Sequence, residues 1–325
     1  YYIYNRSPMV KKTIGVLIFL FLIVQLYAQI QPITSHYMFH PQWSNPAFYG
    51  KKDGINFGAN YRHQWAKLEG QPKTMNVFAD AAIPQARGAV GFTINTDWLG
   101  AFTNTKLNVG YTYIQPIKNK IKFSIGLNAG VEVSKLDGSK LITPEGDNTG
   151  LNDDYLSQQT QRSIRPNLTL GVAVQHQFVE AGISYSNAIN AKDKFKGTTE
   201  TLKPKYGSVF QTYIAGNIKI KKDFSLKPSI VINTDFKEIQ TDISVIARYK
   251  DYIGFGISAR GYNKRSFESL TPIISVGPIK NICIIYSYDV NLTKLNAVNK
   301  GTHELSVTYF LPNSKFYRNP TIINN

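Results

Sequence analysis

Apolar and polar residues alternate with a period of two through most of this chain. In the segment Ile121–Val133 every odd-numbered residue is apolar, and the residues between them are polar or glycine, including Lys122 and Glu132. A helix would place Lys122 and Glu132 on the same side as Ile125 and Ala129, so the pattern indicates a strand. Strands of globular proteins are usually about 5–6 residues long, whereas a tilted strand that crosses a membrane needs about 9–11. The segment therefore predicts a membrane-spanning β-strand.

The composition agrees with membrane strands and argues against a helical membrane protein. Aromatic residues make up 13% of the chain and charged residues 18%, where about 25% charged is usual for a soluble domain. The mean hydropathy is only −0.22. Strands of a membrane barrel produce this combination because every second residue faces lipid and the others face the lumen.

We predict an all-β fold, a transmembrane antiparallel up-and-down β-barrel of about fourteen strands over residues 55–311. An even number of strands places both ends of a bacterial barrel on the same side of the membrane. The expected strands are Ile55–Trp65, Lys73–Ile83, Gly88–Asp97, Asn104–Gln115, Lys120–Lys135, Asn167–Gln177, Phe178–Ser186, Tyr206–Ile220, Ser225–Asn233, Phe236–Lys250, Tyr252–Tyr262, Ser269–Val276, Ile279–Asp289 and Gly301–Leu311.

The lengths of the connections depend on whether the preceding strand is even-numbered or odd-numbered. Those after even-numbered strands are short: Pro84–Arg87, Pro116–Asn119, the junction at Gln177, Lys221–Phe224, Asp251 and Gly277–Pro278. Those after odd-numbered strands are mostly longer: Ala66–Pro72, Trp98–Thr103, Leu136–Pro166, Asn187–Lys205, Asn263–Glu268 and Val290–Lys300. Outer-membrane barrels have short periplasmic turns and longer outer loops. A secreted β-sandwich, the alternative fold, has no reason to sort its loops in this way.

The N-terminal residues resemble an export signal. Lys11 and Lys12 precede the apolar run Ile14–Val24, and Ala28 precedes Gln29. A basic region, a short apolar run and a small residue before the cleavage point are typical of a secretory signal peptide. We expect an upstream extension of the reading frame over residues 1–8 and a signal peptide over residues 9–28. A transmembrane anchor is disfavoured because the run is shorter than the roughly 20 residues that a spanning helix needs.

No arrangement of residues predicts catalysis. The five histidines form no metalloprotease motif, and Pro41 argues against a helix that would bring His36 and His40 onto one face. The sequence contains no Gly-x-Ser-x-Gly elbow and no phosphate-binding loop. The loop Glu145–Asp154 holds carboxylates and amides that suit Ca²⁺, but acidic turn residues are the commoner explanation. We predict no enzyme activity, no cofactor and no metal site.

The chain is basic, with a formal net charge of +16. In an exported protein this charge favours anionic lipid headgroups, lipopolysaccharide phosphates or acidic proteins as partners, and not nucleic acid. Basic residues gather at the short connections, among them Lys118, Lys221 and Lys222. They are either solvated turn residues or part of a positively charged periplasmic rim. We take these three lysines as candidate partner-binding residues.

Residues 29–54 do not follow the strand pattern. The segment is rich in aromatic residues, Pro and Asn, and it is too apolar for a disordered tail. We expect a periplasmic or plug-like segment that fills the lumen or packs under the barrel. Its candidate partner-binding residues are Tyr37, Phe39, Trp43, Phe48 and Tyr49.

Four short motifs, in this order, resemble those of the PorP/SprF family. They are Tyr37–Pro41 with Asn45–Gly50, Tyr61–Trp65 (Tyr-Arg-His-Gln-Trp), Gly70–Thr74 (Gly-Gln-Pro-Lys-Thr), and the ending Tyr286–Asp289 with Gly301–Leu305. These motifs cover the first and last thirds of the chain, and the barrel pattern covers the middle. The family consists of outer-membrane barrels of Bacteroidota that are associated with the type IX secretion system.

The resemblance implies a non-enzymatic outer-membrane component that supports secretion or surface attachment of a large secreted protein, including gliding adhesins. It implies outer-membrane lipid, a secreted protein with a type IX C-terminal domain and periplasmic ring components as partners. One alternative is an outer-membrane porin or solute channel, since lumen-facing residues rich in Gly, Ser, Asn and Thr do not exclude a pore. A lipid-modifying barrel enzyme would need a nucleophile with a base nearby. We expect residues 312–325 to form a C-terminal tail outside the barrel.

Overall fold

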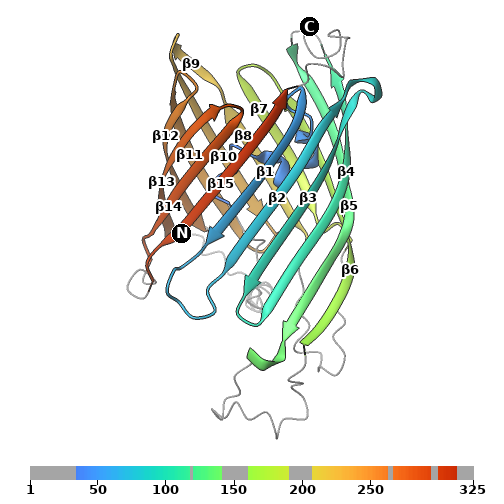
Figure 1. Ribbon diagram of the computed structural model, residues 1–325, viewed down its shortest axis with the longest axis vertical. Coiled ribbons are helices and arrows are strands. Elements are labelled where there is room, and N and C mark those ends of the chain that lie inside the picture. Colours follow the sequence, from blue (N-terminus) through green and yellow to red (C-terminus); the bar gives the residue numbers. More distant parts are fainter. Residues whose placement is uncertain are drawn as a thin grey trace, which may run out of the picture.

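The protein is a closed β-barrel whose strands all tilt in the same sense (Figure 1). The computed structural model describes residues 34–117, 120–140, 160–189, 207–262, 266–293 and 299–312. The expected extension, signal peptide and C-terminal tail lie outside the described residues, except for Pro312. So do Lys118 and the candidate calcium loop Glu145–Asp154. No helix in the described ranges has the length and hydropathy needed to cross a membrane.

The described residues contain fifteen strand segments. They are β1 (Gly54–His63), β2 (Lys73–Ile83), β3 (Gly88–Leu99), β4 (Phe102–Pro116), β5 (Lys122–Asp137), β6 (Thr160–Gln175), β7 (Val179–Ser186), β8 (Val209–Gly216), β9 (Ile218–Lys221), β10 (Phe224–Thr234), β11 (Ile239–Tyr249), β12 (Ile253–Tyr262), β13 (Ser266–Ile279), β14 (Ile282–Asn291) and β15 (Thr302–Pro312).

The barrel wall consists of fourteen strands, because β8 and β9 together form one interrupted strand. We call each of these fourteen a stave. Strands β8 and β9 both pair with β10, and they are separated only at Asn217. The Asn217 N–H donates to the carbonyl of Phe178, 2.7 Å away, at this break. Each stave pairs antiparallel with the next, and β15 pairs with β1 from Gly54↔Pro312 to His63↔His303. The predicted up-and-down barrel of fourteen strands is therefore confirmed.

The two faces of each strand follow the alternation of the sequence. On β5, Ile125 and Leu127 are 51% and 45% exposed, whereas Ser124 and Asn128 are 1% and 4% exposed. The apolar side chains thus lie on the outside of the barrel, where lipid would cover them, and the polar side chains lie in the lumen. This distribution is the reverse of that in a soluble protein, in which exposed apolar residues are scattered singly.

Several predicted connections are shorter in the structure because the hairpins extend beyond the strict alternation. Strands β5 and β6 leave residues 138–159 between them in place of Leu136–Pro166, and β3 and β4 are joined by residues 100–101 alone. Gly277–Pro278 lies inside β13, and the turn is formed by Lys280 and Asn281, which both have positive φ angles. Two consecutive left-handed residues match the twist of a tight hairpin.

The two ends of the barrel still differ in the lengths of their connections. The end with residues 222–223, 250–252 and 280–281 has only short turns, whereas residues 138–159 and 187–208 form the longest connections at the other end. Since periplasmic turns of bacterial barrels are short, we assign the first end (upper in Figure 1) to the periplasm and the other to the outside.

Candidate functional site in the barrel lumen

Residues 34–50 lie inside the barrel, and we call them the luminal segment (Figure 1). The segment contains two short 3-10 turns, η1 (Pro41–Trp43) and η2 (Pro46–Phe48). Proline begins each turn, where its fixed φ angle fits and its missing N–H leaves no bond unmade. Asn45 caps η2 by accepting a hydrogen bond from the N–H of Ala47 at 2.9 Å. The strand pattern therefore begins only after this segment.

The luminal segment runs from the outer half of the lumen to the periplasmic half. Thr34 contacts Glu304, which lies near the outer end of β15. Gly50 donates its N–H to Asp80, 2.9 Å away, near the periplasmic end of β2. Met38 and Phe48 between them are fully buried. Burial of such a side chain contributes about 1.5–3 kcal/mol relative to exposure, so the segment is held by apolar packing as well as by its polar ends.

Glycines in the wall make room for this packing. A Cβ at Gly126 on β5 would overlap the backbone of Pro46 and Ala47, and one at Gly91 on β3 would overlap the ring of Tyr49. Both positions face the lumen, where the alternation expects side chains of ordinary size. The wall and the luminal segment are thus complementary in shape.

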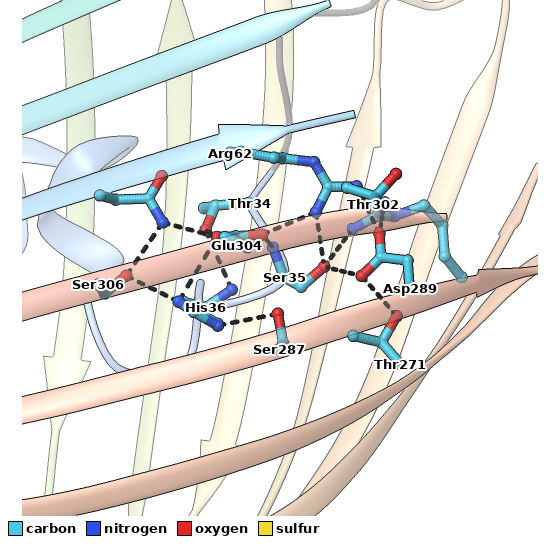
Figure 2. A network of polar contacts seen from close by, with 12 residues as sticks. Thr34, Ser35, His36, Arg62, Thr271, Ser287, Asp289, Thr302, Glu304 and Ser306 are labelled. Atoms are coloured by element: carbon cyan, nitrogen blue, oxygen red, sulfur yellow. Dashed lines mark hydrogen bonds and ion pairs between the residues drawn. The ribbon is translucent and has the colours of Figure 1, made fainter. Parts of the chain in front are cut away.

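An ion network binds the first residues of the luminal segment (Figure 2). Arg62 donates to Glu304 at 2.7 Å and to Asp289 at 2.5 Å, so it bridges β1, β15 and β14. Ser35 joins this network, because its backbone N–H donates to Glu304 at 2.9 Å and its hydroxyl oxygen accepts from Arg62 at 3.1 Å. The three charged side chains are almost completely buried.

A second arginine completes the network from β12. Arg260 donates to Asp242 at 2.7 Å, to Asp289 at 3.4 Å and to the hydroxyl of Ser35 at 3.0 Å. Thr271 donates to Asp289 at 2.9 Å. Buried charges are tolerated only when they are paired and hydrogen-bonded, and each acid here meets both conditions.

His36 connects the network to the neighbouring serines. Its Nδ1 lies 2.7 Å from the Ser306 hydroxyl and its Nε2 lies 3.0 Å from the Ser287 hydroxyl. Burial lowers the pKa of His36, although Glu304, 3.6 Å away, acts in the opposite direction. The neutral imidazole therefore has one donor and one acceptor nitrogen for the two hydroxyls.

The middle of the segment is bonded to the opposite wall. The Tyr37 hydroxyl lies 3.1 Å from the carbonyl of Asp242 and 2.9 Å from the Ser244 hydroxyl, and burial raises the pKa of Tyr37. Lys227 donates to the carbonyl of Met38 at 2.7 Å. The backbone and side chains of the segment thus contact β10 and β11 as well as the β14–β15–β1 wall.

The periplasmic half of the segment contacts the remaining wall. Asn45 donates to the carbonyls of Val172 and Ile183 at 3.2 and 3.1 Å. Asn128 donates to the Tyr49 hydroxyl at 2.8 Å, and burial raises the pKa of Tyr49 to about 12. Contacts on all sides fix the segment across the bore.

The predicted partner-binding residues do not form one site. Tyr37, Phe48 and Tyr49 are buried in the lumen at 5%, 0% and 1% exposure. Phe39 and Trp43 are only partly buried. Phe39 lies under the guanidinium of Arg248 at 5.7 Å, and Trp43 packs on His40 and Phe78 with centroids 4.6 and 5.8 Å away.

The candidate lysines lie on the periplasmic rim. Lys221 and Lys222 are exposed at the turn after β9, and Lys118 lies outside the described residues. The rim also exposes Lys120, Lys250 and Lys280. A role for the aromatic residues or the lysines in binding a partner remains a prediction.

The sequence reasoning missed the ion network. Arg62, Asp289 and Glu304 belong to two of the four quoted motifs, and each is a charged residue at a lumen-facing position of an alternating strand. These lumen-facing charges could have predicted the network, because a charged side chain that is buried in the lumen needs a partner. No group of three or more His, Cys, Asp or Glu that could hold a metal ion occurs in the described part of the chain.

A family model decides the identity of the chain. The model for type IX secretion system membrane protein PorP/SprF matches residues 26–309. The chain belongs to the PorP/SprF family. It is thus an outer-membrane β-barrel of a secretion-system family, and the matched region includes the luminal segment and all but the end of β15. A search of the curated proteins found no match.

Solved structures of outer-membrane barrels share the fold. The monoaromatic hydrocarbon channel CymD is 12% identical with a TM-score of 0.50, covering 87% of this chain and 94% of that chain. The toluene transporter TbuX of Ralstonia pickettii is 13% identical with a TM-score of 0.47, covering 85% and 93%. A FadL homologue of Pseudomonas aeruginosa is 11% identical with a TM-score of 0.45, covering 87% and 96%. At these identities the likeness concerns the fold alone.

Proposed function

We propose that this barrel is a non-enzymatic component of type IX secretion that supports the secretion or surface attachment of a large secreted protein. Its membership of the family supports a role in this system. The proposed role in secretion or attachment of a large protein rests on the luminal segment. This segment crosses the bore and is bonded to the wall from Thr34 to Gly50. A protein that closes its own bore is better suited to binding a protein at its ends than to passing solutes.

The proposed partners follow from the two ends of the barrel. A secreted protein with a type IX C-terminal domain, such as a gliding adhesin, would contact the outer end with the longer connections. Periplasmic ring components would contact the rim with Lys221 and Lys222, where exposed lysines favour an acidic surface. Tyr37, Phe48 and Tyr49 would support partner binding indirectly, by keeping the segment in place, because they are buried.

The alternative is a solute channel. The fold is also that of proteins described as channels and transporters, but the likeness to them extends only to the fold. A solute channel needs an open bore, and barrels with an aqueous bore usually have about 16–18 strands. The fourteen staves enclose a narrower lumen that already holds residues 34–50.

Conductance and capture of the secreted partner test the proposal together. We expect the mature chain in a planar lipid bilayer to show no large steady current. A variant that lacks residues 29–50 should conduct if it still forms a barrel. Purification of the mature chain from outer membrane should recover a large secreted protein, and Lys221→Glu with Lys222→Glu should reduce recovery of periplasmic components only. A large, stable, ohmic current through the intact chain would overturn the proposal and establish the channel.

A further inference from the structure

A cavity of about 220 Å³ lies in the lumen on the outer side of the luminal segment. Tyr37, His40 and Trp43 of the segment line its inner side. At the other end the lining includes Phe102 and Asn187, which adjoin the β3–β4 and β7–β8 connections. Residues of the luminal segment form the floor of this cavity, and we take its mouth to lie at the outer end of the barrel.

The wall of the pocket is rich in uncharged amides. Asparagines line it from five neighbouring strands, β2 to β6: Asn76, Asn95, Asn104, Asn108, Asn128 and Asn167. A side-chain amide offers both a donor and an acceptor. Such a wall recognises ligands whose groups are themselves both donors and acceptors.

The charged residues of the pocket neutralise one another. Glu132 is bound by Arg165 at 2.5 Å and lies 3.9 Å from Lys106. Asp97 interacts electrostatically with Lys106 and accepts a hydrogen bond from Thr74 at 2.8 Å. Lys106 and Arg165 therefore balance the two carboxylates. A charged ligand would find no excess of opposite charge here, so the lining favours an uncharged ligand.

Four polar atoms of lining residues have no hydrogen-bond partner among the described residues. They are the ring nitrogens His40 Nε2 and Trp43 Nε1 and the amide oxygens Asn128 Oδ1 and Asn167 Oδ1. Three of these side chains are less than a tenth exposed: His40 at 6%, Asn128 at 4% and Asn167 at 5%. A buried polar atom without a partner is unfavourable. Neighbouring atoms cover each of these four atoms, so a ligand hydroxyl reaches them only when the lining side chains shift.

We propose that this pocket binds a neutral saccharide, with one or two sugar residues inside it. Hydroxyl groups match the amide wall as both donors and acceptors, and the C–H face of a pyranose packs on an aromatic ring such as Trp43. The pocket faces the cell surface, so the ligand is a free sugar or the terminal residue of a surface glycan. This site is separate from the proposed role in secretion, and the test of one does not decide the other.

Titration calorimetry of the full mature chain in detergent micelles tests the proposal. The probes are glucose, galactose, N-acetylglucosamine and maltose, beside glucuronate and tetra-alanine as a charged sugar and a neutral peptide. We expect at least one neutral sugar to bind with a Kd in the millimolar range, as for a ligand of about a dozen non-hydrogen atoms. The methyl glycoside of the best sugar separates the two sources. Retained binding shows that the pocket accepts the end of a glycan, and lost binding restricts the ligand to the free sugar.

Matched variants place the binding in the pocket. Trp43→Phe and Asn167→Ala should each weaken sugar binding about tenfold, the effect of one lost hydrogen bond to a polar site. The controls are Trp98→Phe and Asn56→Ala, which change the same residue types outside the pocket lining and should leave the Kd unchanged. Asn167 lies on β6, so its variant remains informative if Trp43→Phe disturbs the luminal segment.

Three results would overturn the proposal. The first is the absence of binding by every neutral sugar at concentrations far above the millimolar range. The second is preferential binding of tetra-alanine or glucuronate. The third is a sugar affinity that neither Trp43→Phe nor Asn167→Ala changes, since the sugar would then bind elsewhere. None of these results bears on the conductance or on the capture of a secreted protein.

Discussion

At the scale of single residues, the stability of the luminal segment depends on a few buried charges. Arg62 contacts Glu304, Asp289 and Ser35, so it joins three strands and the segment. Replacing a whole buried ion network by apolar residues is often neutral, whereas removing one partner leaves the others unpaired. Loss of Arg62 therefore leaves Glu304 without its paired cation.

We expect Arg62→Met to lower the free energy of unfolding by about 3–5 kcal/mol, because Glu304 loses its paired cation and Oδ2 of Asp289 keeps only the longer contact with Arg260, at 3.4 Å. Urea titration of the barrel in lipid vesicles measures this change. Arg162→Met is the matched control, since Arg162 is exposed, and it should change the free energy by less than about 0.5 kcal/mol. Equal effects of the two substitutions would show that the network contributes nothing to stability.

The histidines predict how docking of the segment depends on pH. Burial lowers the pKa of His36 and of His40 in the docked segment, so the undocked segment binds protons more readily. The contribution of these residues to docking is fully present above the ordinary histidine pKa of about 6.5 and is lost as the pH falls below it. Glu304 and Asp289 attract a proton to His36 and Arg62 repels it, but burial dominates.

Hydrogen-exchange protection of residues 34–50 between pH 8 and pH 5 measures this dependence. We expect protection to decrease toward pH 5 in the native chain. His36→Asn with His40→Gln should flatten the profile, because neither replacement titrates. His303→Asn is the control, as His303 is exposed on the outside of β15. Protection that rises toward low pH would contradict the sign of the argument.

At the scale of elements, the barrel wall and the luminal segment fit by the size of their facing residues. Strand β5 places Gly126 under η2, and β3 places Gly91 under Tyr49. A strand interior normally disfavours glycine, which packs no side chain and loses more entropy on folding. Here the close approach of a second backbone explains why the glycine is tolerated.

We expect Gly126→Val to weaken docking of the segment by about 1–3 kcal/mol, because the added side chain overlaps Pro46 and Ala47. The readout is hydrogen-exchange protection of residues 34–50, with heat-modified gel migration to show that the barrel still forms. Ala129→Val on the same strand is the control, since its side chain is exposed on the outside. Unchanged protection in Gly126→Val would mean that the segment does not lie against β5.

At the scale of the whole molecule, the two ends of the barrel differ in connection length and in exposed charge. The short turns carry exposed lysines, and the longer connections lie at the opposite end. The luminal segment separates an outward pocket from the periplasmic rim. The molecule thus presents a different surface to each compartment, with the luminal segment between them.

Epitope insertions test the orientation of the whole barrel. A tag after Ser139, beyond β5, should be reached by antibody on intact cells, whereas a tag after Asp223, in the turn before β10, should be reached only after permeabilisation. Both tags should be equally accessible in permeabilised cells, which controls for expression. The reverse pattern on intact cells would show that the barrel is inserted with the opposite orientation.

The sequence by itself determined the features that depend on neighbouring residues. A period of two decides which side chains share a face, so the outward position of Ile125 and the lumen position of Asn128 were predictable without a partner strand. Turn residues between alternating runs separated the strands and set their even number. Strand ends were less predictable, because a hairpin extends wherever its two arms can still pair, as β5 and β6 do beyond the alternation.

Only the tertiary structure decided what meets in the lumen. Arg62, Asp289 and Glu304 are separated by up to about 240 residues in the chain, and closure of β15 onto β1 brings them together around Ser35. The same closure creates the concave wall against which the luminal segment folds and the pocket that the segment leaves on its outer side. Local patterns show which charged residues face the lumen but not which of them meet, because the contacts depend on the register of all the staves around the barrel.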